Sequence, residues 1–61
     1  MKLTIKIDMG NAAFEDNSPG VEIDLILNRF LNKLPAEPQN MDFHELRDTN
    51  GNIVGEAEFT V

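Results

Sequence analysis

The chain has 61 residues, no cysteine, one histidine, and eleven acidic against five basic side chains, which give a net charge of −6. A chain this short forms a single domain, residues 1–61, and without cysteine it holds no disulfide and no thiolate metal site. The negative charge argues against direct binding to nucleic acid or to an anionic membrane, because both ligands require a positive patch.

The first predicted element is a β-strand over residues 2–9. Apolar and polar side chains alternate strictly there, and this period of two is typical of a strand with one buried face. The residues expected on the buried face are Leu3, Ile5, Ile7 and Met9. A long connection rich in Asn, Asp, Gly and Pro follows over residues 10–20.

An amphipathic helix is predicted over about residues 19–34. Ser18 stands at the N-cap position, Pro19 at the first helical position, and Pro35 ends the helix. At about 100° per residue, six apolar side chains fall on one stripe that we expect to face the sheet. They are Ile23, Ile26, Leu27, Phe30, Leu31 and Leu34.

Two further strands, over residues 42–47 and 53–61, are predicted to form a hairpin. Asn50-Gly51 between them is typical of a type I′ turn, in which both central residues have positive φ. In the first of these strands Phe43 and Leu46 stand three apart, so we expect a bulge or a bend there. In the last strand, alternation places one set of side chains inward: Ile53, Gly55, Ala57, Phe59 and Val61. Val54 is then expected on the outer face.

The element order β-α-β-β predicts an α+β fold with one helix packed on a three-stranded antiparallel sheet. Lys2 and Lys6 lie on the outer face of the first strand, and Glu56 and Glu58 on the outer face of the last. Opposite charges on neighbouring strands stabilise a sheet, so the C-terminal strand is predicted to be central. The residues expected together in the core are Ile5, Phe30 and Phe59.

The sequence offers no arrangement typical of catalysis. His44 is the only side chain that titrates near neutral pH, and Ser18 is used as a helix cap, so a Ser-His-Asp triad is not expected. The segment Asp48–Asn52 superficially resembles a calcium loop, but its glycine does not stand where an EF-hand needs one. We therefore expect no enzymatic activity, no metal and no cofactor.

Two surface features are candidates for partner contact. The first is a run of acids without any base between residues 8 and 24, namely Asp8, Glu15, Asp16, Glu22 and Asp24. Spaced carboxylates either imitate a nucleic-acid backbone in the groove of a basic partner or only keep the protein soluble. The second feature is Val21 and Leu25, opposite the apolar stripe of the helix. Either residues 12–14 fold back over them, or they contact a partner or a second copy.

Several segments resemble a group of small phage- and prophage-encoded proteins, most of which carry no assigned function. The most specific segments are Asn11-Ala12-Ala13-Phe14 and Arg47-Asp48-Thr49-Asn50-Gly51-Asn52-Ile53-Val54-Gly55, and the likeness spans nearly the whole chain. The resemblance implies a phage origin. Small acidic phage proteins of this kind look like counter-defence factors, anti-CRISPR proteins among them, which act by stoichiometric binding to a host complex.

The expected function is therefore inhibition of a host defence complex, through binding of a host protein with a basic surface. Arg47 and Asp48 flank the predicted turn without an obvious structural need, so they are further contact candidates, with a local ion pair as the alternative. No export signal or membrane-spanning run is present, and the host cytoplasm is the expected location. The other functional reading is a structural or assembly accessory protein of the phage particle, or a homo-oligomeric module, and a homodimer is compatible with either.

Overall fold

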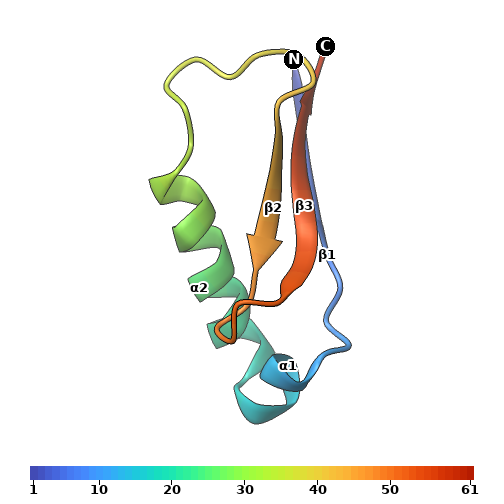
Figure 1. Ribbon diagram of the computed structural model, residues 1–61, viewed down its shortest axis with the longest axis vertical. Coiled ribbons are helices and arrows are strands. Elements are labelled where there is room, and N and C mark those ends of the chain that lie inside the picture. Colours follow the sequence, from blue (N-terminus) through green and yellow to red (C-terminus); the bar gives the residue numbers. More distant parts are fainter.

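The computed structural model describes all residues, 1–61, as one three-stranded sheet and two helices (Figure 1). The elements are β1 (Lys2–Ile7), α1 (Ala12–Asp16), α2 (Pro19–Asn32), β2 (Phe43–Arg47) and β3 (Ile53–Thr60). The sheet order is β1-β3-β2, and β3 runs antiparallel to both neighbours. The predicted α+β fold with a central C-terminal strand is confirmed. The short helix α1 was not predicted.

The register of the sheet agrees with the charge argument in part. Lys6 lies directly opposite Glu56, whereas Lys2 lies opposite Thr60, and Glu58 opposite Thr4. One lysine thus faces an acid across the ladder. The charge pattern was sufficient to predict the strand order, although it overstated the number of facing pairs.

Helix α2 begins where the sequence predicts and ends slightly earlier. Ser18 is the N-cap, and its backbone C=O accepts the N–H of Glu22 at 3.1 Å, but its hydroxyl makes no capping hydrogen bond. The helix ends at Asn32, so Leu34 belongs to the connection that leads to β2. Neither helix combines the length and the apolar character that a bilayer crossing requires.

The core lies where α1 and α2 meet the inner face of β2 and β3. The apolar cluster consists of Phe14, Ile26, Phe30, Leu46, Val54, Ala57 and Phe59. Phe14 reaches this cluster from α1, and Ile23 of α2 packs against its margin. Phe30 and Phe59 are therefore buried together, as predicted.

The inner face of β1 is largely uncovered, which corrects the prediction for Ile5. Leu3 and Ile5 lie opposite Phe59 and Ala57 in the ladder and so share the inner face of the sheet, yet they are 43% and 39% exposed. Figure 1 shows the cause: α2 runs beside β2, and β1 lies beyond β3 at the far edge. A helix about 10 Å wide covers roughly two strands spaced about 4.8 Å apart, so the third strand stays open.

The hairpin between β2 and β3 has a different turn from the predicted one. The N–H of Asp48 donates to the C=O of Asn52 at 2.9 Å, and the N–H of Gly51 donates to the C=O of Asp48 at 3.1 Å. Of the two central residues predicted to have positive φ, only Gly51 does, at 86°. The type I′ assignment is therefore wrong. The loop is a three-residue connection in which a tight turn is followed by a left-handed glycine.

The bulge or bend expected between Phe43 and Leu46 is absent: these residues pair regularly with β3 and lie on opposite faces, with Phe43 53% and Leu46 2% exposed. An irregularity lies instead beside the turn, and it adds its extra residue to β3. The pairing shifts between Leu46 and Arg47 and leaves Val54 without an opposite residue on β2. Val54 is consequently buried and Ile53 exposed, which reverses the faces predicted for them. At the adjacent Gly55, a Cβ would lie 2.0 Å from the carbonyl oxygen of Lys6, so a glycine allows the close approach of β1.

Candidate interaction surfaces

The acidic residues predicted as a contact surface divide into an exposed group and one buried member. Asp8, Glu15, Asp16 and Asp24 are exposed, whereas Glu22 is 1% exposed. Asp8 comes directly after β1, Glu15 and Asp16 lie on α1, and Asp24 lies in the first half of α2. Helix α1 and the start of α2 form the end of the molecule drawn lowest in Figure 1. This end therefore carries negative charge on its surface, but Glu22 contributes none of it there.

Glu22 is buried because it fastens the hairpin loop to the start of α2. Its Oε1 accepts the backbone N–H of Thr49 at 2.7 Å, and its Oε2 accepts the side-chain amide of Asn17 at 3.2 Å. A buried carboxylate requires such hydrogen bonds to offset the loss of water. Glu22 thus holds two segments of the fold together and does not form part of an exposed contact surface.

Asp48 is also fully buried, at the base of the hairpin loop. Its Oδ1 accepts the backbone N–H groups of Asn50 and Asn52, each at 2.9 Å, and its Oδ2 accepts the side-chain amide of Asn11. Its backbone C=O accepts Nη1 of Arg29 at 2.8 Å. The residue therefore joins the loop to the start of α1 and to α2, which corrects its assignment as a contact residue.

Hydrogen bonds and burial act in opposite directions on the pKa of Asp48, and the hydrogen bonds together have the larger effect. Burial raises the pKa of this carboxyl, but the hydrogen bonds from Asn11 and from the backbone N–H groups of Asn52 and Asn50 lower it further, so the pKa lies below its ordinary value of 3.8. The side chain is therefore ionised inside the fold at neutral pH.

Arg47 and Val21 remain on the surface, in different settings. Arg47 pairs with Glu45 at 3.5 Å and donates from Nη1 to the C=O of Gly51 at 2.9 Å, so it has the local ion pair that was the alternative to a contact role. Val21 is 63% exposed, and Leu25 is half-buried. Phe14 of α1 enters the core, and Val21 is left uncovered.

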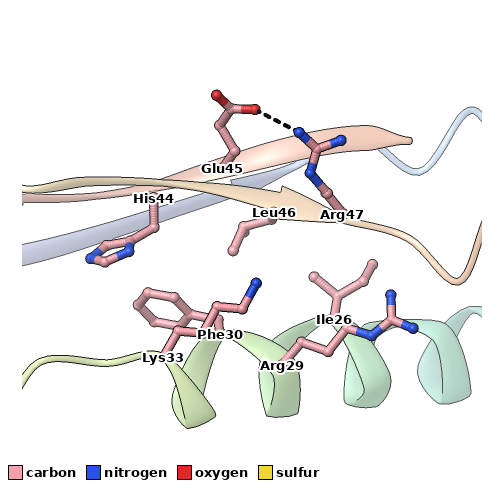
Figure 2. A pocket seen from close by; sticks show the side chains of 8 residues that line it. All are labelled: Ile26, Arg29, Phe30, Lys33, His44, Glu45, Leu46 and Arg47. Atoms are coloured by element: carbon pink, nitrogen blue, oxygen red, sulfur yellow. Dashed lines mark hydrogen bonds and ion pairs between the residues drawn. The ribbon is translucent and has the colours of Figure 1, made fainter. Parts of the chain in front are cut away.

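A groove of about 220 Å³ lies between α2 and β2 (Figure 2). Its lining residues are Ile26, Arg29, Phe30, Lys33, His44, Glu45, Leu46 and Arg47. Figure 2 shows His44 and Leu46 pointing toward α2, while Glu45 and Arg47 extend from the other face of β2. The groove therefore gathers three of the five basic residues of the chain and its one histidine.

The His44 ring forms part of the groove's apolar wall. It meets the rings of Phe30 and Phe59 edge-on, with centroids 5.4 Å and 6.4 Å apart, and its Nε2 is buried without a hydrogen-bond partner. Sequence reasoning missed this groove. The four-residue spacing of Arg29 and Lys33 places both on one flank of the helix, but nothing local in the sequence says that β2 lies next to that flank.

No group of three or more His, Asp or Glu side chains is arranged to hold a metal ion. Comparison with protein-family models, curated proteins and solved structures gives no match. The candidate surfaces are therefore defined by their own geometry: an acidic end around α1, a basic groove beside β2, and the uncovered inner face of β1.

Proposed function

We propose that this protein acts by stoichiometric binding to a protein with a basic surface, and that it is a phage-encoded inhibitor of a host defence complex. The observation that supports this proposal is a group of exposed acids on a segment without any base. Asp8, Glu15, Asp16 and Asp24 are exposed around α1 and the start of α2, and no basic residue lies between residues 8 and 24.

The basic residues lie outside this segment of the chain. Lys2 and Lys6 extend from the outer face of β1, and Arg29, Lys33 and Arg47 surround the groove beside β2. An acidic end that no cation on its own segment neutralises attracts a positive patch on a partner. It also accelerates encounter, because long-range attraction steers the two surfaces together.

Helix α1 makes the acidic end a fixed surface. Phe14 anchors this helix in the core, and Asn11, directly before it, donates to the buried carboxylate of Asp48. Glu15 and Asp16 thus project from a helix that is held at both its apolar face and its start. Surfaces ordered before binding lose less conformational freedom on association, which favours affinity.

The class of partner rests on the resemblance to small phage proteins. Counter-defence factors of that kind act on host complexes, and carboxylates presented on a rigid helix suit a groove that normally holds a nucleic-acid backbone. This partner would be met in the host cytoplasm. The other reading, a structural or assembly accessory of the phage particle, is favoured by the exposed Val21, which is apolar and lies outside the acidic set.

The proposal is tested by affinity capture from host cells, with partners identified by mass spectrometry. The key variant is the double charge reversal Glu15→Lys with Asp16→Lys, since neither side chain makes a hydrogen bond within the fold. We expect it to weaken capture of the partner by about tenfold or more, because two charges of a complementary interface are inverted.

The matched control is Glu37→Lys with Glu58→Lys, which changes net charge equally at residues outside both helices whose side chains make no hydrogen bond within the fold. Capture should be nearly unchanged in the control, and it should fall for the native protein at about 1 M salt, where the Debye length is about 3 Å. A second assay measures phage growth on an immune host that produces this protein. Growth that the native and control proteins restore, and the α1 variant does not, would identify a host defence complex as the partner. Capture that survives both the reversal and high salt would refute an acidic interface.

A further inference from the structure

Exposed apolar side chains lie on the inner face of β1 and on the flank of α2 that points away from the groove. At about 100° per residue, Leu31 lies about 160° around the helix from both Arg29 and Lys33, which line the groove on the β2 side. Leu31 therefore projects toward the β1 side, where it is 58% exposed. Leu3 and Ile5 on the inner face of β1 are 43% and 39% exposed, so this side of the molecule carries exposed apolar side chains.

The backbone of β1 is also unpaired along its outer edge. The N–H of Asp8 donates to the C=O of Val54 at 2.7 Å, so the even-numbered positions direct their backbone groups toward β3. Alternation leaves the N–H and C=O groups of Leu3, Ile5 and Ile7 at the free edge. Unlike β2, which is interrupted beside Arg47, β1 pairs regularly with β3 over its whole length, and a regular edge strand with free backbone groups is a template for another strand.

We propose that β1 pairs antiparallel with β1 of a second copy of this chain, about a twofold axis at Ile5. This pairing joins the two three-stranded sheets into one continuous sheet. Ile5 then faces Ile5 of the second copy, Leu3 faces its Ile7, and Lys2 faces its Asp8. The exposed inner-face side chains of the two β1 strands meet at the axis, and each α2 covers one outer end of the joined sheet.

Charge selects this register over its neighbours. A pairing centred on Thr4 places Lys2 of each copy opposite Lys6 of the other. A pairing centred on Lys6 places the two Lys6 side chains opposite each other. Both registers bring like charges together, which is repulsive. A pairing centred on Leu3 leaves the second half of the strand unpaired. The register centred on Ile5 instead sets Lys2 against Asp8, while Lys6 retains Glu56 opposite it on its own β3.

The molecule is extended and exposes more surface than a compact chain of its length. Its radius of gyration is 12.0 Å, against about 10.5 Å for a compact chain of this length. Its accessible surface is 4220 Å², against about 3,950 Å² for a folded monomer of this mass. A stable interface removes roughly 800 Å² from each partner. Pairing at the β1 edge removes part of this surface from water, because it satisfies the free backbone groups and brings the inner-face side chains of the two β1 strands side by side.

A single introduced cysteine tests the register, because the chain has none of its own. Residues that face each other in a hydrogen-bonded antiparallel pair have Cα atoms about 5.5 Å apart, within the range of roughly 4.4–6.8 Å that a disulfide spans. We expect Ile5→Cys to form a covalent dimer under mild oxidation. Thr4→Cys, one residue out of register, and Val21→Cys, exposed on α2, are the controls. Equal yields for the three variants would overturn the proposal.

Exchanging the charges of residues 2 and 8 gives an independent test, in which sedimentation equilibrium measures the dimer dissociation constant. Lys2→Asp and Asp8→Lys each place like charges opposite each other at two symmetric positions, and we expect each to raise the dimer dissociation constant by about tenfold. The double variant re-creates the attraction and should dissociate less readily than either single variant, whereas Val21→Lys should leave dissociation unchanged. A strictly monomeric native protein, or a double variant no tighter than Asp8→Lys alone, would refute the interface.

Discussion

The two edge strands of the sheet, β1 and β2, pair with the same central strand yet differ in what lies over them. Leu46 of β2 is 2% exposed beneath α2, whereas Leu3 of β1 is 43% exposed although it lies on the same face of the sheet. Both strands contain inward-facing apolar residues. The comparison teaches that the position of one helix, and not the strand pattern, decides which edge becomes core.

The difference matters because the domain is small. At roughly 0.05–0.15 kcal/mol per residue, a chain of this length has a free energy of unfolding of about 3–9 kcal/mol. Full burial of one leucine contributes about 1.5–3 kcal/mol, so one uncovered edge is a large fraction of the total. The following substitutions break or sharpen the contrast between the two edges, from the largest expected effect to the smallest.

The largest effect is expected for Gly55→Ala, where β1 meets β3. The added methyl group would lie 2.0 Å from the carbonyl oxygen of Lys6, and that backbone cannot move without separating the strands. We expect a loss of about 3 kcal/mol or more in urea unfolding. The matched control is Gly20→Ala in α2, where nothing lies within 4 Å of the new Cβ and a gain of roughly 0.5–1 kcal/mol is expected. Equal responses would contradict the close approach of β1.

The next effect compares the two leucines directly. Leu46→Ala should cost about 2–5 kcal/mol, because it leaves a cavity under α2. Leu3→Ala should cost less than about 1 kcal/mol when measured on the dilute monomer, because its side chain retains much of its contact with water. Thermal or urea unfolding of both variants at low protein concentration provides the measurement. A costly Leu3→Ala under those conditions would mean that β1 is covered after all.

A smaller, pH-dependent effect is expected for Asp48→Asn at the base of the hairpin loop. Because the pKa of Asp48 is lower in the fold than the ordinary 3.8, its ionised form contributes stability above that pH. This contribution is lost as pH falls through the lowered pKa. The native protein should therefore lose stability in acid more steeply than Asp48→Asn, whose melting temperature is compared from pH 7 down to about pH 2. Parallel pH profiles for the two proteins would show that the carboxylate is not held as described.

The smallest effect is expected for Lys6→Ala on the exposed face of β1. The lysine faces Glu56 across the ladder, and such exposed pairs contribute roughly 0.2–1 kcal/mol. Lys2→Ala, opposite Thr60, is the control and should change the unfolding free energy of the dilute monomer less. The difference between the variants should shrink in high salt, and a difference that persists there would not be electrostatic.

The sequence predicted the order of the strands because lysine and glutamate alternate on the outer faces of β1 and β3. It failed for Ile5, since alternation identifies a face but says nothing about what covers it. It failed for Val54, because one extra residue in β3 inverts the faces of the residues before it. Each failure has a tertiary cause that local pattern does not contain.

The buried acids illustrate the same limit for the candidate contact residues. Asp48 carried a local signal, because an aspartate at the start of a turn accepts the N–H two residues on, here from Asn50. Glu22 carried none. An acid in the first turn of a helix is typical of an exposed dipole partner, whereas its bond to Thr49 spans 27 positions of the chain.

The hairpin loop has a consequence for the order of folding. Its partners are remote: Asn11 and Arg29 reach Asp48 across 37 and 19 positions. Closing long stretches of chain costs entropy that local structure does not repay, and remote pairings slow the approach to the native state. These two hydrogen bonds are therefore expected to form late in refolding, after α2 and the strands have met. The tip of the hairpin is accordingly where the native state should first come apart.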